Sequence, residues 1–256
     1  MTMSMPEIEQ RLKELRLSGV RATLHTRILQ AQSSNQAFIE TFSFLLQDEL
    51  DRRRSRLIER RYQQSGLDEK LTLAEFDWGF NPKLPKHACF ELHTLKFIAG
   101  GENALLIGRP GTGKSHIAKA IAYQAILQGY RVQYLETDEF FVRYALSAPA
   151  LRQTRLRSIL EADLLVLDDL FLSKRIPEGA GELLQSIIHQ RYKLRRSVIV
   201  TSNRIVEDWA AYLGDNIMAT TILDRLMHRN HELEFEGKSY RLKEAAEKLA
   251  RKPKSR

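Results

Sequence analysis

The sequence predicts an α/β fold, in which helices flank a parallel five-stranded sheet and a small all-helical domain precedes it. From about residue 100, short apolar runs alternate with segments of helical periodicity, which is the pattern of βαβ units. Before that point, residues 1 to about 70 show helical periodicity throughout. Strands of a parallel sheet are covered on both faces, and their sequences are therefore continuous apolar runs.

The helical domain is predicted to occupy residues 1–75. The segment PEIEQRLKELRL (6–17) has apolar residues at helical spacing, and residues 38–64 continue as one long helix. Gly19 and the polar segment QSSNQ (32–36) are the expected breaks between helices, because glycine and small polar residues favour turns.

The rest of the chain is predicted to form a sheet domain at 76–241 and a basic tail at 242–256. The domain opens with the turn-rich stretch DWGFNPKLPKH (77–87), which is either a boundary or a strap. The expected strands, in chain order, are residues 103–108, 131–136, 163–169, 197–203 and 232–237. The tail should begin as a helix and end in the frayed basic cluster RKPKSR (251–256).

The composition is that of a globular protein, since 43% of the residues are hydrophobic and 28% are charged. No apolar run approaches the length of about 18 residues that a membrane span needs, and the N-terminus lacks an apolar signal-peptide core. The single cysteine, Cys89, excludes a disulfide within the chain and fits a reducing compartment. We therefore expect a cytoplasmic protein without membrane contact. The net charge of +8 suggests a polyanionic partner.

A phosphate-binding motif follows the first expected strand. The residues GRPGTGKS (108–115) fit G-x-x-x-x-G-K-[ST] and stand between a strand and a helix, as the motif requires. Glycines let backbone amides approach phosphate oxygens, and the helix start adds partial positive charge. Lys114 can reach the β and γ phosphates, and the Ser115 hydroxyl can bind magnesium. The predicted nucleotide-binding residues are Gly108, Pro110, Gly111, Thr112, Gly113, Lys114, Ser115 and the adjacent His116.

Two adjacent carboxylates close the apolar run LLVLDD (164–169). One interpretation is a strand that runs out into solvent. The other is a functional pair, because the carboxyl ends of parallel strands border the ligand site in open α/β sheets. Because the phosphate-binding loop at 108–115 (the P-loop) is expected at the same edge of the sheet, the functional pair is favoured over the solvent-exposed strand end. Asp168 then binds magnesium together with Ser115, and Asp169 orients or deprotonates the water that attacks the γ phosphate.

The run SVIVTSN (197–203) ends in polar residues at the same expected edge of the sheet. Asn203 can hydrogen-bond the γ phosphate or the attacking water. The alternative is an Asx turn that caps the strand.

Together these motifs resemble those of AAA+ ATPases over about residues 75–241. Six segments narrow the resemblance to the branch that includes the helicase loader DnaC and the IstB-type transposition helpers. They are GRPGTGKSHIAKAIA, DLLVLDDL, RYKLRRSVIVTSN, VEDWAAYLGD, ATTILDRLMHR and GKSYRLKEA. The chain looks most like the IstB family, whose ATPase is encoded beside the transposase in one class of bacterial insertion sequences. The N-terminal helical segment also has the length expected of that family.

The resemblance implies a bacterial, ATP-dependent homo-oligomer that uses Mg2+, binds and remodels double-stranded DNA, and delivers a cognate transposase to target sites. It implies that Asn203 is the first sensor. Arg225, in LDRL, matches an arginine finger that reaches into the neighbouring subunit's ATP site, and Arg241, in SYRL, is a looser match to a second sensor. The implied catalytic residues are thus Lys114, Asp169, Asn203 and Arg225.

Two features depart from the AAA+ pattern. Most AAA+ proteins have Asp-Glu at the strand end, whereas this chain has Asp168-Asp169. Aspartate is one methylene shorter, so its carboxylate should fall about an ångström short, and such a misplacement can cost about a hundredfold in rate. In addition, the segment after Arg241 is too short for the helical lid of many AAA+ proteins, and we expect little or no C-terminal lid.

An arginine-rich segment, DRRRSRLIERR (51–61), is the candidate DNA contact. On a helix Arg53, Arg56 and Arg60 share one stripe, Arg52 lies beside it, and guanidinium groups bind duplex phosphates in bidentate fashion. The alternative is a solvated helix face, since the N-terminal domain carries almost equal numbers of basic and acidic residues. No zinc-ligand spacing or helix-turn-helix pattern predicts base-specific readout.

The favoured function is therefore an ATPase that assembles on duplex DNA and recruits or activates a transposase. A helicase loader similar to DnaC would have nearly the same ATPase core and would differ in an N-terminal domain that docks on a helicase. A small-molecule P-loop kinase would instead need a phosphate-acceptor pocket and lid arginines within one chain.

Overall fold

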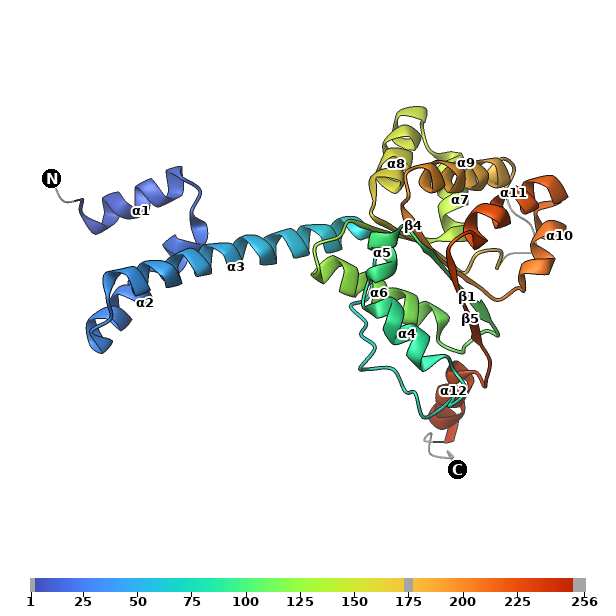
Figure 1. Ribbon diagram of the computed structural model, residues 1–256, viewed down its shortest axis with the longest axis horizontal. Helices are drawn as coiled ribbons and strands as arrows, with labels where there is room; N and C mark the ends of the chain where they lie inside the picture. Colours follow the sequence, from blue (N-terminus) through green and yellow to red (C-terminus); the bar gives the residue numbers. More distant parts are fainter. Residues whose placement is uncertain (1–2, 173–176, 251–256) are drawn as a thin grey trace, which may run out of the picture. The chain divides into compact units, whose positions relative to one another are not determined.

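The structure, a computed structural model, describes residues 3–172 and 177–250 (Figure 1). It contains two compact units, Met1–Arg60 and Arg61–Arg256. The domain boundaries that the sequence predicts at residues 75 and 241 stay a prediction. None of the described helices combines the length and the apolar character that crossing a bilayer requires.

The N-terminal unit is built from α1 (Met5–Glu14), α2 (Ser18–Ser34) and the first part of α3 (Phe38–Ser65). Its core is small, because among its described residues, from residue 3 onward, the buried members of the cluster are Val20, Leu24 and Leu45. Partly buried apolar residues of α1 and α2, including Ile8 and Leu12, pack around these three.

Gly19 is not a break between helices, as the sequence suggested, but the second residue of α2. A methyl group on its Cα would lie 2.5 Å from the Cα of Glu49, so the glycine is needed for the close approach of α2 and α3. The Glu49 carboxylate accepts hydrogen bonds from the amides of Gly19, at 2.5 Å, and Val20, at 3.3 Å. Glu49 therefore caps the N-terminus of α2 from the neighbouring helix.

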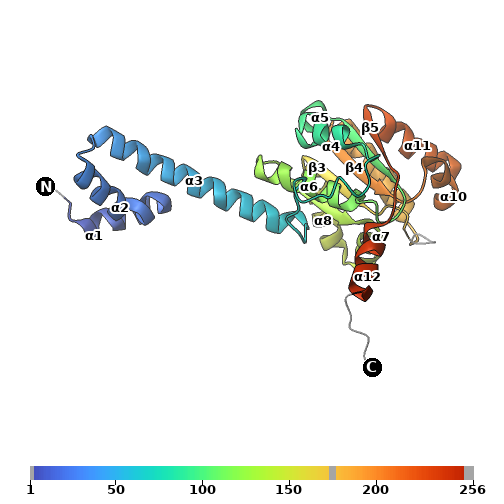
Figure 2. The same ribbon diagram turned by 90° about the horizontal axis from the view of Figure 1, so that it is seen from below.

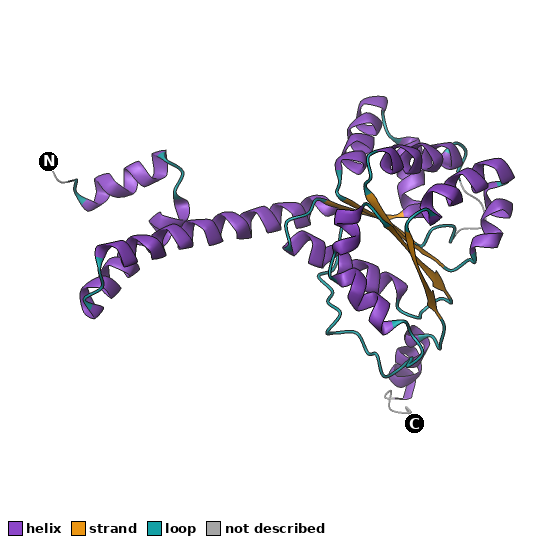
Figure 3. Cartoon of the chain, in the orientation of Figure 1, coloured by secondary structure: helices purple, strands orange, loops and turns teal. Residues whose placement is uncertain are grey.

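The second unit contains the expected parallel sheet (Figure 3). Its strands are β1 (Asn103–Gly108), β2 (Val132–Glu136), β3 (Leu164–Asp168), β4 (Ser197–Ser202) and β5 (Asn230–Phe235). The strand order is β2-β3-β4-β1-β5, and every neighbouring pair is parallel. The predicted fold class is thus confirmed, and β1 pairs with β5 from Asn103 opposite Asn230 to Gly108 opposite Phe235.

Helices cover both faces of the sheet (Figures 1 and 2). The helices of this unit are α4 (Lys86–His93), α5 (Lys96–Gly100), α6 (Lys114–Leu127), α7 (Thr137–Leu146), α8 (Pro149–Glu161), α9 (Ala180–Lys193), the 3-10 helix η1 (Val206–Asp208), α10 (Trp209–Leu213), α11 (Asn216–Met227) and α12 (Tyr240–Ala250). Alternate strand residues such as Leu105, Leu165 and Val200 pack with α7 to α11 in one large core. The buried apolar side of α6 packs on the other face, against β1 to β4.

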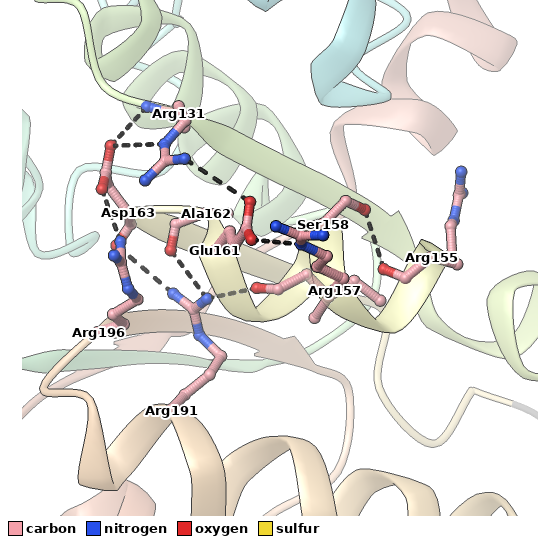
Figure 4. A network of polar contacts seen from close by, with 10 residues as sticks. Arg131, Arg155, Arg157, Ser158, Glu161, Ala162, Asp163, Arg191 and Arg196 are labelled. Carbon is pink, nitrogen blue, oxygen red and sulfur yellow. Dashed lines mark hydrogen bonds and ion pairs between the residues drawn. The ribbon is translucent and has the colours of Figure 1, made fainter. Parts of the chain in front are cut away.

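A buried polar network joins the beginnings of the strands at the end of the sheet opposite the P-loop (Figure 4). Arg191 of α9 is fully buried, and burial is the main reason that its pKa falls to about 9. Its guanidinium group donates hydrogen bonds to the main-chain oxygens of Ile159, Ala162, Asp163 and Ser197. The Asp163 carboxylate accepts from the amide of Arg131 at 2.8 Å and from the side chain of Arg196 at 2.7 Å. The network fixes the C-terminus of α8 against β3 and β4.

The turn-rich stretch before α4 is a strap. Its Asn81 side chain hydrogen-bonds the main chain of Lys238 in both directions, at 2.9 and 3.0 Å. Further upstream, the main-chain oxygen of Thr72 lies 3.1 Å from Nε2 of His116. The amide of Tyr240, at the start of α12, donates to the Gly111 oxygen at 2.9 Å. The strap and α12 are therefore both tied to the region around the P-loop.

Candidate active site

A cavity of about 700 Å³ lies beside the loops that follow β1, β3 and β4. Nine of the predicted site residues line it, namely Gly111, Thr112, Gly113, Lys114, Ser115, His116, Asp169, Asn203 and Arg241. Gly108 and Pro110 do not line it. Gly108 ends β1 at φ 150, where a side chain would meet the Phe235 oxygen, so its role is to let β1 and β5 approach. The topology thus gathers most of the predicted site at one edge of the sheet.

Backbone amides of the P-loop are free to bind an anion. Within the part of the chain that the structure describes, the amides of Gly111, Thr112, Gly113, Lys114 and Ser115 donate no hydrogen bond. Most buried or half-buried amides are paired, and a run of unpaired ones at a helix N-terminus is a phosphate cradle. The residues present therefore fit a nucleotide.

Lys114 is buried, and its ammonium group is held inside the loop. It donates to the oxygens of Gly108 at 2.8 Å and Arg109 at 2.9 Å, and to Oδ1 of Asn203 at 2.7 Å. The pKa of Lys114 is lowered to about 8, mainly by burial; the charges of Asp169 and Asp168 oppose this shift, and Arg241 adds a smaller lowering effect. Phosphate oxygens would replace these neutral acceptors with charged ones, which a buried ammonium prefers.

Asp168 lies beneath the cavity rather than in its lining and is almost fully buried. Its Oδ1 accepts a hydrogen bond from the Thr201 hydroxyl at 2.5 Å, and its Oδ2 accepts from the Tyr134 hydroxyl at 2.6 Å. Sequence reasoning missed Tyr134, because a tyrosine inside a strand normally signals only packing. The two hydroxyl groups fix the orientation of the carboxylate.

Asp169 faces the cavity. Its φ of 50° is in the left-handed region, so the main chain turns directly after β3. Its amide donates to the Thr201 hydroxyl at 2.9 Å, and its Oδ1 accepts from Nδ2 of Asn203 at 3.3 Å. Burial, and next the adjacent Asp168 carboxylate, raise the pKa of Asp169, as suits a group that accepts a proton. Even with its shorter side chain, this aspartate lines the cavity.

The oxygen donors around the cavity suit magnesium better when a nucleotide supplies further ligands. No group of three His, Cys, Asp or Glu side chains able to hold a metal occurs within residues 3–172 and 177–250. Ser115 and Asp169 border the cavity, with Asp168 just beneath, and Mg2+ commonly takes one or two protein ligands together with substrate phosphates. The residues therefore fit a magnesium ion that arrives with a nucleotide, and the assignment of Asp168 as its ligand stays a prediction.

Sequence reasoning also missed the strap as part of the site. Phe76 packs against Gly113, where a side chain would overlap its ring, and its ring lies 5.2 Å from that of His116. Phe80 stacks edge-on against Tyr240 at 5.2 Å, and all these rings border the cavity. The signal in the sequence was the aromatic spacing in FDWGF, but only the fold places that segment at the P-loop.

Arg225 lies at the other end of β1. The side chain of Asn103, the first residue of β1, donates to the main-chain oxygens of Arg225 and Leu226. The P-loop begins at Gly108, five residues further along the strand, and at about 3.3 Å per residue this is roughly 17 Å away. Arg225 therefore cannot reach the nucleotide cavity of its own chain.

The candidate DNA-contact residues lie on α3 in the N-terminal unit. Nε of Arg53 donates to Oε1 of Glu49 at 2.7 Å, so this arginine supports the carboxylate that caps α2. Arg52, Arg56 and Arg60 are exposed and have no ion-pair partner among the described residues. In the stripe, Arg53 thus has a structural partner, whereas Arg56 and Arg60, like the adjacent Arg52, have none among the described residues.

A family model for IstB-like ATP-binding proteins matches residues 10–248. An ATP-binding protein of insertion sequence IS21 from Pseudomonas aeruginosa is 33% identical over 241 residues, which are 94% of this chain and 90% of that protein. An insertion-sequence ATP-binding protein of Mycobacterium tuberculosis is 30% identical over 238 residues, covering 92% and 94%. A third, from IS5376 of Geobacillus stearothermophilus, is 32% identical over 216 residues, covering 84% and 85%.

Solved structures show the same fold. DnaI superimposes with a TM-score of 0.56 at 20% identity, over 66% of this chain and 90% of that one. DnaA from Aquifex aeolicus, solved with AMPPCP bound, gives 0.53 at 24% identity, over 73% and 56%. These similarities show that the second unit shares the fold of these proteins.

Proposed function

Because the chain belongs to the family of IstB-like ATP-binding proteins, we propose that it is an ATPase that assembles on duplex DNA and recruits or activates a transposase. The resemblance suggested by the sequence is confirmed at the level of the family. The proposal covers four properties: ATP hydrolysis, assembly into oligomers, DNA binding and a transposase as partner.

The observation that carries the proposal is the separation of Lys114 and Arg225. Lys114 lies at the P-loop cavity, whereas Arg225 lies beside Asn103 at the beginning of the same strand. An arginine that stabilises the transition state of phosphoryl transfer must touch the γ phosphate. Arg225 can do so only at the cavity of another copy, and this supports a homo-oligomer with shared sites.

The other residues have roles that follow from their positions. The free P-loop amides and Lys114 bind and orient the phosphates. Asp169 accepts a proton from the attacking water, and Asn203, which contacts both Lys114 and Asp169, positions that water. Magnesium, held through Ser115 and Asp168, would supply positive charge at the phosphate oxygens.

DNA and a transposase are proposed as partners on other grounds. The relatives are named as ATP-binding proteins of insertion sequences, whose mobility requires a transposase acting on DNA. The net charge of +8 and the unpaired arginines of α3 suit a sequence-independent contact with phosphates. A cytoplasmic location, where such DNA lies, is part of the same proposal.

The test is electron microscopy of the protein with ATP, magnesium and duplex DNA, combined with an assay of phosphate release and a pull-down with the cognate transposase. We expect DNA-bound oligomers that form with ATP and retain the transposase. Lys114→Ala is the control, because it should abolish nucleotide binding or hydrolysis while the circular dichroism spectrum stays unchanged. Monomers under all conditions, or unchanged turnover in the Lys114→Ala variant, would contradict the proposal.

A further inference from the structure

The turn that follows β3 and begins at Asp169 has an unusual main chain. The amide of Leu172 donates to the Asp169 oxygen at 3.2 Å and closes a β-turn. Asp169 has φ 50°, and Phe171, the third residue of the turn, has φ 63°. Glycine or asparagine is the ordinary residue at that third position, because a larger side chain is crowded there. The turn is therefore strained, and it persists only if its surroundings hold it.

The end of β4 holds this turn at successive points. The amide of Leu170 donates to the main-chain oxygen of Thr201 at 2.9 Å, and the Ser202 hydroxyl donates to the Leu170 oxygen at 2.9 Å. Nε of Arg204 donates to the Phe171 oxygen at 2.9 Å. Arg204 thus makes the last of these contacts, at a residue whose φ is positive.

The Arg204 side chain is itself held by aromatic residues. Its guanidinium group lies 4.0 Å from the centre of the Tyr212 ring, and Nη2 donates to the Tyr212 hydroxyl at 3.0 Å. The buried Phe171 ring packs against the rings of Tyr212 and Trp209, at centroid distances of 5.4 and 5.2 Å. The planar guanidinium group can donate to a main-chain oxygen and stack on an aromatic ring at once. Arg204, Phe171, Trp209 and Tyr212 form one cluster, which we call the Arg204 clamp.

The carboxylate of Asp169 depends on this main chain for its position. Two short hydrogen bonds fix the neighbouring Asp168 carboxylate. The Asp169 carboxylate receives one hydrogen bond among the described residues, of 3.3 Å, from Asn203. A displacement of about 1 Å at a reacting group can cost about a hundredfold in rate. A firmly held turn therefore suits a short carboxylate that has to meet an attacking water.

We propose that Arg204 is a positioning residue for ATP hydrolysis, because it holds the turn that places Asp169 against the attacking water. Arg204 acts through the main chain and not on the phosphates, since it does not line the P-loop cavity and directs Nε and Nη2 to Phe171 and Tyr212. The proposal rests on the proposed function, because it requires the chain to hydrolyse ATP.

The clamp should act on hydrolysis and not on nucleotide binding. It holds the turn after β3, whereas the phosphates bind at the loop after β1. Arg204→Ala should therefore lower kcat by at least about tenfold and leave the Kd for a fluorescent ATP analogue within about twofold of the wild type. Arg204→Lys keeps the positive charge but not the planar fork, so it should recover only part of the lost turnover.

Arg152→Ala is the matched control. Nε of Arg152 also donates to a main-chain oxygen, that of Ser147 at 2.8 Å, and its guanidinium group lies 5.8 Å from the centre of the Tyr144 ring. These contacts join the end of α7 to α8, and Arg152 does not line the P-loop cavity. The variant removes contacts of the same kind, and its kcat should stay within about twofold of the wild type.

A second background shows whether Arg204 acts through Asp169. Asp169→Glu adds a methylene and a rotatable bond, so the carboxylate can reach the water from a displaced main chain. In this background Arg204→Ala should lower kcat by less than about threefold, against at least about tenfold in the native background, because coupled residues have non-additive effects. An equal cost in the two backgrounds would mean that Arg204 does not act through Asp169, and the proposal would be wrong.

Amide hydrogen exchange reports the turn itself and needs no turnover. The amides of Leu170 and Leu172 should exchange at least about tenfold faster in Arg204→Ala than in the wild type or in Arg152→Ala, because local opening of the turn becomes easier. Unchanged exchange, unchanged kcat in Arg204→Ala or full turnover in Arg204→Lys would each overturn the clamp.

Two further outcomes separate the clamp from other causes. If Arg204→Ala loses analogue binding as well as turnover, Arg204 is needed for the fold rather than for positioning, and the proposal is wrong. If the wild type binds ATP without hydrolysing it, the proposed function is wrong instead, and exchange at Leu170 still shows whether Arg204 holds the turn.

Discussion

The Tyr134 hydroxyl donates a hydrogen bond of 2.6 Å to Oδ2 of Asp168, and thereby holds one oxygen of the carboxylate that ends β3. Burial, and next the charge of Asp168, raise the pKa of Tyr134 far above neutrality, so the hydroxyl keeps its proton and stays a donor. With Thr201 on the other oxygen, the carboxylate is fixed before any nucleotide binds. Tyr134 is thus a positioning residue for the predicted magnesium ligand.

Tyr134→Phe should lower the free energy of unfolding by about 1–3 kcal/mol, because it removes a hydrogen bond from a buried charged acceptor. Urea denaturation measures the change. Tyr123→Phe is the control, since the Tyr123 hydroxyl makes no hydrogen bond to any residue that the structure describes, and it should change stability by less than about 0.5 kcal/mol. Equal midpoints for the two variants would show that the Tyr134–Asp168 bond contributes nothing.

The arginines of α3 should separate into two kinds. Arg56→Ala with Arg60→Ala should weaken binding to any duplex sequence and reduce the salt-dependence slope by about 2, because each lost phosphate contact releases one counterion fewer. Stability should stay unchanged. Fluorescence anisotropy over a salt series measures both affinity and slope. An unchanged slope would mean that the stripe is a solvated face and that DNA binds elsewhere.

Arg53→Ala should instead loosen the cap on α2, because Arg53 supports the Glu49 carboxylate that accepts from Gly19 and Val20. Amide hydrogen exchange at Gly19 and Val20 should accelerate in this variant and not in the Arg56/Arg60 variant. Exchange that is equal in the two variants would argue against the cap.

Cys89 should be unreactive in the folded protein. It is fully buried, and burial raises the pKa of its thiol from 9.0 to about 12. The thiolate, which is the reactive form, is therefore almost absent at pH 8. Because the folded pKa is the higher one, this group favours folding below pH 9 and that contribution is lost as the pH rises toward 12. Labelling with a chromogenic disulfide should be slow at pH 8 and fast in urea, and rapid labelling of native protein would contradict the burial.

The sheet could be predicted because each strand is recognisable from its own short run of apolar residues. Leu164 to Leu167 are buried on both faces of the sheet, and such strands are apolar at every position rather than at alternate ones. The P-loop could be predicted for a similar reason, since its glycines and Lys114 act within one short segment.

The rest of the site depends on contacts between distant residues. Tyr134 meets Asp168 only because β2 and β3 are neighbours in register, and Asn81 meets Lys238 only because the strap crosses to the end of β5. Gly19 was misassigned as a break because its reason is not local, since it makes room for Glu49 on another helix. A glycine needed for close packing and one needed for a turn look alike in a sequence.

The shared site makes a prediction about mixtures of two inactive variants. Asp169→Asn keeps the shape of the side chain but removes the charge that accepts a proton, so ATP binding should persist and hydrolysis should fall by at least about a hundredfold. Complexes with ATP and DNA should outlast those of the wild type. Asp168→Ala should instead weaken magnesium-dependent nucleotide binding. Arg225→Ala should also be inactive alone, because the arginine is then missing from every shared site.

Mixing Asp169→Asn with Arg225→Ala should restore activity. A site is competent when an intact Asp169 meets an intact Arg225 from the next copy, and random assembly of an equal mixture makes about a quarter of the sites competent. Steady-state phosphate release should therefore rise to a maximum near equal proportions and fall toward zero at either end, with co-assembly verified by light scattering. If co-assembly is confirmed and no ratio exceeds the parents, Arg225 does not act in trans. Since Arg225 cannot reach the cavity of its own chain, it would then have no part in hydrolysis. The proposal that two copies share each ATP site would then be wrong.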